Sequence, residues 1–394
     1  MKKIFDVIVV GLGAMGSAAL YQLAKRRCDV LGIDQFSPPH HFGSTHGDTR
    51  ITRQALGEGA EYVPLVLRSN EIWRELERTT GTELFERIGG LIMSSRSSLR
   101  RIKGISTFFQ NTITTAKEHN IPHMLLDTDE IRNYFPQFNL VGDEEGYYEY
   151  GAGFLRPERC VEVQLRLAKE IGAEIFLNEK VLAIKTELNN DMVTVQTTGG
   201  NYIAKKVVVS AGAWVSKILG EEFTRYFRIS RQILLWFDIQ KSKKSAQSFL
   251  PKNFPIFIWE FGRGSMYGFP AIDGIHGGLK IGSEQYEQFV DPDSVDKRVS
   301  DEEIQIMYSE RVYNRIPALR SKCLKAVSCL YTITPDRNFI IDFLPDHPNI
   351  IVASPCSGHG FKHSAAIGEV VSELALYEKS SIDISKFLFQ RLLS

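Results

Sequence analysis

The sequence has no apolar run approaching the ~18–20 residues that a membrane-spanning helix needs. It has no excess of charge of either sign, because 47 Lys and Arg balance 47 Asp and Glu. This balance gives no basic surface for nucleic acid or an anionic membrane. Neither end resembles a secretory signal, a peroxisomal signal or a lipidation tail. We therefore expect a cytoplasmic protein that binds neither nucleic acid nor membranes.

Cysteine is also scarce, and the five cysteines are scattered: Cys28, Cys160, Cys323, Cys329 and Cys356. An odd number without CxxC pairs argues against a disulfide framework or a zinc site, so no metal is expected. The sequence shows no internal repeat and no low-complexity linker. A chain of 394 residues can build two domains, and we expect these to be interleaved.

The first 35 residues predict a βαβ unit. Residues 5–10 are almost continuously apolar, which is typical of a parallel strand buried on both faces. Gly11, Gly13 and Gly16 follow at once as GxGxxG, a spacing that permits a tight turn, a close pyrophosphate and close helix packing. Asp34 ends the next predicted strand, where an acid would bind ribose hydroxyls. The unit predicts a dinucleotide site without distinguishing FAD from NAD.

Two later segments favour FAD. Residues 206–214 form a second apolar strand that ends near Gly212, and residues 349–362 form a third strand that leads into a glycine-containing helix start. The positive end of such a helix could face the electron-rich edge of a reduced flavin.

Hydrophobic periodicity predicts four further helices and two groups of strands. The helices are expected at 63–79, at 161–171, from Ser300 to near Pro317, and at 361–376. Ser300 and Glu303 would form a capping box. Short strands are expected within 173–209. Alternation over 228–281, with Gly262-Arg263-Gly264 as a hairpin, indicates an antiparallel sheet under a second domain.

Three motifs carry a family resemblance: GSTHGDTR at 43–50, CLYT at 329–332 and SGHGFK at 357–362. They are similar, in residues and in spacing over nearly the whole chain, to the family of monomeric sarcosine oxidase and N-methyl-tryptophan oxidase. The resemblance implies an α/β (α+β) fold in which a glutathione-reductase-like, FAD-binding Rossmann domain is interleaved with an antiparallel-sheet substrate domain. We assign 1–86, 145–220 and 321–394 to the first domain, and 87–144 and 221–320 to the second.

The resemblance also implies a reaction. A small secondary amino acid, N-methyl or cyclic, would be oxidised to an imine that water hydrolyses to an aldehyde and an amino acid, while O2 is reduced to H2O2. The enzyme would be a monomer whose partners are the amino acid and O2.

Residue by residue, the resemblance implies a flavin bound covalently through Cys329, which by itself would be read as a small buried hydrophobe. The expected cofactor contacts are Gly11, Gly13, Gly16, Asp34, Ser44, His46, Cys329, Gly358, His359 and Gly360.

Lys280 lies in GLKIG at 278–282, and strand alternation directs it away from Leu279 and Ile281. It matches a lysine near the flavin, where a fixed cation would stabilise nascent superoxide. The alternative is a solvated lysine on an edge strand. With Lys280, the expected catalytic residues are Arg50, beside the flavin ring, and Tyr331.

Arg53 and Lys362 match a pair that binds the substrate carboxylate, one as a planar fork and the other as a point charge. Tyr267, Phe269 and Thr49 complete the expected substrate site, although core packing alone could explain the two aromatic residues.

Three departures leave the identity of the amino acid open. Thr45 and Glu284 stand where sarcosine oxidase has histidines, and Ile258 replaces a methionine. An acid at 284 would favour a larger or cationic amine, or would face solvent. The alternative functions are a dehydrogenase that uses another electron acceptor, a flavin-binding protein or tailoring factor without turnover, and an NAD-dependent dehydrogenase.

Overall fold

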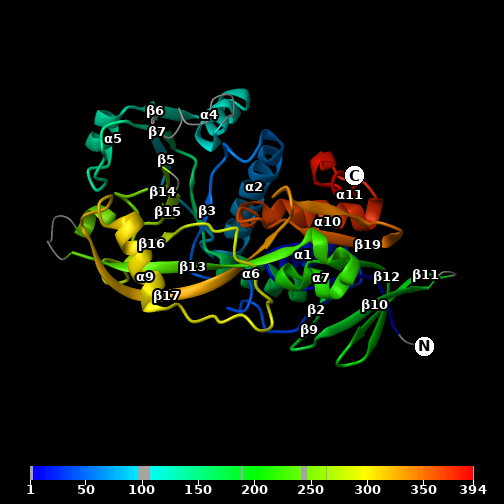
Figure 1. The fold of residues 1–394 in the computed structure, drawn as a ribbon. Helices are drawn as coiled ribbons and strands as arrows, with labels where there is room; N and C mark the ends of the chain where they lie inside the picture. The colour runs from blue at the N-terminus through cyan, green and yellow to red at the C-terminus, as the bar shows by residue number, and fades with distance from the viewer. Residues whose placement is uncertain (1–2, 96–106, 188–189, 241–245, 263, 394) are drawn as a thin grey trace.

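The computed structural model describes residues 3–95, 107–187, 190–240, 246–262 and 264–393. Two eight-stranded sheets lie side by side, and a three-stranded sheet accompanies them (Figure 1). Strands of the two large sheets alternate along the chain, because segments from the middle of the sequence build most of the second sheet. The predicted interleaved α/β fold is confirmed.

The first sheet is centred on β1 (Ile4–Val10), which pairs in parallel with β2 (Val30–Asp34) and β12 (Asn201–Val209). On the far side of β12, β19 (His347–Ser354) is again parallel. The other strands are β9 (Glu174–Leu177), β10 (Val181–Glu187), β11 (Asn190–Thr197) and β18 (Ile340–Leu344). From Val7 onward, every residue of β1 is buried, as its apolar run predicts.

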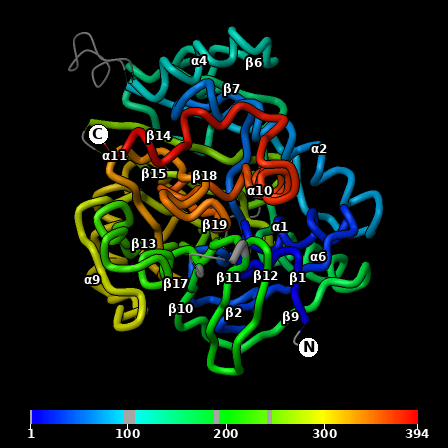
Figure 2. Tube along the Cα trace, turned by 90° about the vertical axis from the view of Figure 1, so that its right-hand side faces the viewer, coloured from blue at the N-terminus to red at the C-terminus, as the bar shows by residue number. Residues whose placement is uncertain are grey.

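Four helices pack around this sheet: α1 (Ala14–Lys25), α2 (Val63–Thr80), α6 (Pro157–Glu170) and α10 (Ser364–Tyr377). Helix α1 contacts both α6 and α10, and Figure 2 shows α10 beside α1. The approach is close, since a Cβ on Gly368 would lie 2.5 Å from the Cβ of Ala18.

Three helix boundaries differ from the prediction, and one of them is the end of the helix expected to reach Pro317, which is α-helical only over Asp301–Met307. Helix α6 begins at Pro157 rather than at 161, because proline is well suited to the first turn, where its missing N–H costs nothing. The helix expected from 361 begins as a 3-10 turn, Phe361–His363, and becomes α-helical only at Ser364.

The second sheet has the order β17-β13-β16-β15-β14-β5-β7-β6. Its strands are β5 (Gly90–Ser95), β6 (His123–Leu126), β7 (Glu144–Glu149), β13 (Arg228–Ile239), β14 (Ile256–Phe261), β15 (Gly264–Gly268), β16 (Leu279–Gly282) and β17 (Leu319–Ile333). The antiparallel arrangement expected over 228–281 is confirmed, and β14 and β15 form the hairpin. Arg263 of its turn lies outside the described residues. Among the described strand pairs of this second sheet, only β5–β14 is parallel.

The remaining elements complete the layers. They are the three-stranded sheet of β3 (Arg50–Thr52), β4 (Phe85–Arg87) and β8 (Gly153–Leu155), and the helices α4 (Phe108–Glu118), α5 (Thr128–Tyr134), α7 (Val215–Leu219), α9 (Asp301–Met307) and α11 (Gln390–Leu393). The capping box at Ser300 and Glu303 is present at the start of α9. This helix then continues as a π-turn, Tyr308–Val312.

Strands β13 and β17 form a long antiparallel pair, which runs from the second sheet toward the first in Figure 1. Strands β17 and β7 belong to the second sheet, although most of their residues fall in the ranges assigned above to the first domain. The domain boundaries themselves stay a prediction. Within the described residues, no helix is long and apolar enough to cross a membrane.

Candidate active site

The glycine turn after β1 is as tight as its spacing requires. Gly11 has φ +87°, and a Cβ there would lie 2.7 Å from the Ser210 carbonyl oxygen. A Cβ on Gly16 would lie 1.7 Å from the Gly11 carbonyl oxygen, so only glycine allows α1 to approach the turn. The Ser210 hydroxyl donates to the carbonyl oxygens of Val10 (3.2 Å) and Gly11 (2.8 Å), which ties the turn to the end of β12.

Asp34 lies beside this turn. One carboxylate oxygen accepts from the Leu12 N–H at 2.7 Å, and the other accepts from the Phe36 N–H at 2.8 Å. Burial raises the pKa of Asp34 to about 6, although both backbone hydrogen bonds oppose the shift. Gly13 is the N-cap residue of helix α1, and no side chain caps the first N–H groups of the helix. Its first N–H groups and its positive end therefore face the adjoining space, which suits a pyrophosphate.

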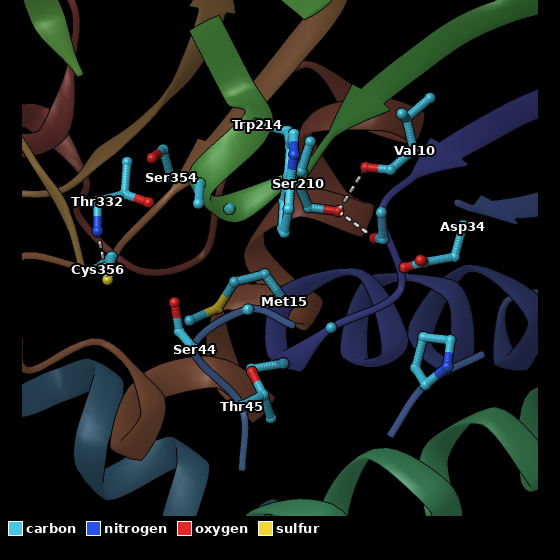
Figure 3. Close-up of a pocket in the computed structure, with 18 of the residues that line it drawn as sticks. Val10, Met15, Asp34, Ser44, Thr45, Ser210, Trp214, Thr332, Ser354 and Cys356 are labelled. Atoms are coloured by element: carbon cyan, nitrogen blue, oxygen red, sulfur yellow. Dashed lines mark hydrogen bonds between the residues drawn. The ribbon is translucent and has the colours of Figure 1, made fainter. Parts of the chain in front are cut away.

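That space is the first of two cavities. Figure 3 shows part of its wall, which includes the ends of parallel strands, the loop after β2, the start of α1 and the end of β17. The labelled residues are Val10, Met15, Asp34, Ser44, Thr45, Ser210, Trp214, Thr332, Ser354 and Cys356. Ligands of doubly wound folds bind at this edge of the sheet. The glycine cradle, the uncapped helix and the Asp34 carboxylate together fit a dinucleotide cofactor such as FAD.

The second cavity lies under the second sheet and is more polar. Its lining includes Thr49, Arg53, Glu58, Tyr267, Phe269, Lys280, Glu284, Cys329 and Lys362. Four residues line both cavities: Arg50, Tyr331, Gly358 and Phe361. We call these four residues the junction. A group bound in the first cavity and a molecule bound in the second would meet there.

Lys280 is buried at the wall of the second cavity, with 3% of its surface exposed. Its Nζ contacts the carbonyl oxygens of Gly47 (2.6 Å) and Thr49 (2.9 Å) and the Thr49 hydroxyl (3.0 Å). The ring of Phe269 lies beneath it, 4.5 Å away. Burial and then Arg50 lower the pKa of Lys280 well below its usual value. Because a hydroxyl can accept or donate, these three oxygens can hold the group in either protonation state.

Strand β16 lies inside the sheet, between β13 and β15, so Lys280 is not an edge-strand lysine. Leu279 and Ile281 point to the opposite face, into the core, as alternation predicts.

Arg53 and Lys362 lie together, but a carboxylate of the chain stands between them. Glu58 contacts the Arg53 guanidinium at 2.6 Å and the Lys362 Nζ at 3.5 Å. Burial would raise the pKa of Glu58, yet Arg53 and Lys362 hold it well below its usual value. Burial lowers the pKa of Lys362 to about 8, against the pull of Glu58. The Arg53 Nε is buried and has no hydrogen-bond partner among the described residues.

The two cysteines near the junction face different cavities. Cys329, on β17, is 3% exposed and lies against the second cavity with Leu234 and Trp236. Burial raises the pKa of its thiol, while Arg50 and Lys280 oppose the shift. Cys356 lines the first cavity, and its Sγ accepts from the Thr332 N–H at 3.3 Å (Figure 3).

The other expected cofactor contacts are divided. Ser44 and Gly360 line the first cavity, and the Ser44 hydroxyl donates to the Leu330 carbonyl oxygen. His359 lines the second cavity, 4.0 Å from Glu58. His46 lines neither, and burial, aided by Arg50 and Lys280, lowers its pKa to about 3.

Glu58 and Cys356 were not singled out from the sequence. Glu58 lies five residues after Arg53, in a loop without a recognisable motif. Cys356 directly precedes the SGHGFK motif, and this position is the only sequence signal that places it near the site.

A doubly wound sheet with this glycine turn, facing a second sheet across a shared junction, fits an enzyme that holds a dinucleotide beside a second ligand. The chain matches the family model described as FAD dependent oxidoreductase over residues 6–374, and it belongs to that family. It is therefore an FAD-dependent enzyme.

Two groups of relatives span the whole chain. Monomeric sarcosine oxidase of Streptomyces avermitilis is 39% identical, over 100% of this chain and 99% of that protein. N-methyl-L-tryptophan oxidase of Escherichia coli (strain K12) is 34% identical, over 98% of this chain and 99% of that protein.

Among solved structures, L-proline dehydrogenase from P. horikoshii is similar with a TM-score of 0.82, at 22% identity over 100% of this chain and 99% of that chain. NikD, an unusual amino acid oxidase, has a TM-score of 0.81 at 20% identity, over 98% of both chains. At such identities these structures support the fold alone.

The internal ion pair generates a prediction. Glu58→Gln leaves Arg53 and Lys362 buried without a countercharge, so we expect the free energy of unfolding to fall by about 3–5 kcal/mol. Urea unfolding followed by circular dichroism would measure it. The matched control is Glu71→Gln, which removes an exposed pair with Arg68 at 2.8 Å and should cost less than about 1 kcal/mol. Equal losses in the two variants would contradict the role of Glu58 as a buried countercharge.

Proposed function

We propose that the protein oxidises a small secondary amino acid, N-methyl or cyclic, to an imine and reduces O2 to H2O2. The proposal rests on the junction, where the first cavity meets the second. The second cavity is lined by Arg53 and Lys362, which share Glu58 as a countercharge, and by the buried Lys280. The names of the relatives, sarcosine oxidase and N-methyl-L-tryptophan oxidase, support this class of substrate.

Arg53 and Lys362 bind the substrate carboxylate in this proposal. The buried Arg53 Nε without a partner and the Lys362 ammonium supply donors of the kind that a carboxylate accepts. Glu58 already occupies part of this site, so a substrate carboxylate exchanges with an internal one. Fixing the carboxylate here orients the rest of the amino acid toward Arg50, Tyr331 and the junction.

Bound FAD would supply the redox chemistry, accepting a hydride equivalent from the substrate C–H bond and returning the electrons to O2. Tyr267, Phe269 and Tyr331 exclude water from the reacting carbon, and water hydrolyses the imine product to an aldehyde and an amino acid. Lys280 is held in place by the carbonyl oxygens of Gly47 and Thr49, and in its protonated form it stabilises the superoxide that forms beside it. The enzyme acts as a monomer on its amino acid and O2.

Peroxide release tests the proposed function directly. Purified enzyme would be given N-methyl amino acids, cyclic secondary amino acids and the matching primary amino acids, with H2O2 and O2 measured together. We expect secondary amino acids to give equal amounts of O2 consumed and H2O2 formed. Bleaching of the flavin without peroxide would show a dehydrogenase with another acceptor. No bleaching with any amino acid would show a protein without this turnover.

A lysine variant tests the role of Lys280. We expect Lys280→Met to slow the reaction of the reduced enzyme with O2 by about a hundredfold, the loss typical of removing one preorganised charge-stabilising group. Anaerobic reduction by the substrate should change far less. Stopped-flow absorbance would follow the two half-reactions separately, and Lys325→Met, which removes an exposed lysine near Trp236, serves as the control. Equal slowing of both half-reactions would exclude the oxygen role.

Two cysteine variants test the attachment of the cofactor, which we propose to be covalent through Cys329. We expect Cys329→Ala to release all flavin on acid precipitation, whereas Cys356→Ala, the matched variant at the first cavity, should keep it bound to the denatured chain. Absorbance and mass of the precipitate would measure the attachment. A tether that survives in Cys329→Ala and disappears in Cys356→Ala would reassign it to Cys356.

A further inference from the structure

Glu284 is a carboxylate of the second cavity to which the proposed function assigns no role. It lies two residues beyond the end of β16, it lines the second cavity, and its side chain is exposed there. One carboxylate oxygen accepts a hydrogen bond from the Tyr286 hydroxyl at 2.8 Å. Burial raises the pKa of Glu284, and the Tyr286 hydrogen bond opposes this shift.

The Glu284 carboxylate lies at the junction. A Cβ on Gly358 would be 3.0 Å from the Glu284 Oε1, 3.0 Å from the Tyr286 hydroxyl oxygen and 2.9 Å from the Tyr331 ring. Gly358 and Tyr331 line both cavities. Oε1 is therefore within a few ångströms of the place where a bound substrate would meet the cofactor.

The two carboxylates near the Arg53–Lys362 pair differ in their partners. Glu58 is paired with both cations. Across the described ranges, no Lys, Arg or His nitrogen lies within salt-bridge distance of Glu284, and its hydrogen-bond partner is a neutral phenol. An unpaired carboxylate on the wall of a cavity offers a partner to a cationic group of a ligand that enters the cavity.

The ligand proposed above carries such a charge. An α-amino acid in water at neutral pH is an ammonium ion whose nitrogen lies only two bonds from its carboxylate carbon. When Arg53 and Lys362 hold the carboxylate, the nitrogen is brought toward the junction. A secondary ammonium group cannot become an imine by hydride loss until its nitrogen lone pair is free.

We propose that Glu284 is a catalytic residue of this oxidation, which binds the substrate's secondary ammonium group and accepts its proton. The N–H bond breaks and an O–H bond forms on Glu284, so the nitrogen lone pair is released. Hydride loss from the neighbouring carbon then gives a protonated imine, whose C=N double bond uses the released lone pair. Glu284 returns its proton to water once the product leaves. The inference rests on the proposed function.

Other titratable and charged groups face Glu284. They are Tyr267, Tyr286, Tyr331, Glu58, Arg53 and Lys362. Burial raises the pKa values of the three phenols, so they stay neutral. Burial lowers the pKa of nearby His359 to about 4 and that of Lys362 to about 8. Because the pKa of Asp34 is also raised, to about 6, a loss of activity on the acid side is assigned to Glu284 only if Glu284→Gln removes it.

Binding of two isosteric ligands tests the first half of the proposal without turnover. N,N-dimethylglycine carries a protonated amine, and 3-methylbutanoate has the same shape with carbon in place of nitrogen. By titration calorimetry at pH 7, we expect the wild type to bind the amine at least tenfold more tightly. Glu284→Gln should reduce this preference below threefold and leave the Kd of 3-methylbutanoate within threefold of wild type. An unchanged preference would overturn the proposal.

The pH dependence of anaerobic flavin reduction tests the proton transfer. We expect the wild-type rate at saturating amino acid to fall on the acid side, where Glu284 becomes protonated, and Glu284→Gln to lose that dependence. Tyr286→Phe removes the hydrogen bond that favours the carboxylate, so it should raise the pKa of Glu284 and move the acid limb to higher pH. An acid limb that persists in Glu284→Gln, or that stays in place in Tyr286→Phe, would overturn the role.

The two proposals fail in different ways. If the wild type bound neither ligand and no amino acid bleached its flavin, both would be wrong. If the wild type oxidised amino acids with peroxide release while Glu284→Gln kept its ligand preference and its acid limb, only the role of Glu284 would be excluded.

Discussion

The hydrogen bonds from Lys280 to Gly47 and Thr49 hold the loop after the first βαβ unit against the second sheet. The loop leaves the first sheet at β2 and continues into β3 with Arg50 and, just beyond it, Arg53. A buried amine satisfied by two backbone carbonyl oxygens cannot move without leaving polar groups unpaired in a dry environment. This constraint fixes the loop, and with it both arginines, relative to the strand that carries Cys329 and Tyr331.

The second cavity, which meets the first at the junction, is lined by several charged groups. Burial and then Arg50 lower the pKa of Lys280, Glu58 pairs with Arg53 and Lys362, and Glu284 faces the cavity with a phenol as its hydrogen-bond partner. Charges so placed act in a region of low dielectric, where each contributes more than on the surface. The same groups therefore stabilise one another when no substrate is bound and orient an amino acid when one is.

Local signals in the sequence gave the parts of this arrangement that depend on neighbouring residues. The glycine spacing determined the turn at Gly11 and Gly16, and strand alternation determined the face on which Lys280 lies. The parallel pairing of β5 with β14, and the position of Glu58 between Arg53 and Lys362, join residues that no periodicity connects. Such contacts depend on the packed whole, and only the resemblance to a family indicated that Arg53 and Lys362 would meet. The site roles, the covalent attachment and the domain boundaries stay predictions.

Gly358 has φ +92°, and any larger residue there would collide with Tyr331, Glu284 and Tyr286. At Gly358, where the two cavities meet, the second cavity is thus bounded by backbone that tolerates no added carbon, while other parts of its wall, such as Ile258, are ordinary side chains. A change of ligand preference, in evolution or in engineering, therefore has to come from the side chains that line this cavity and not from position 358.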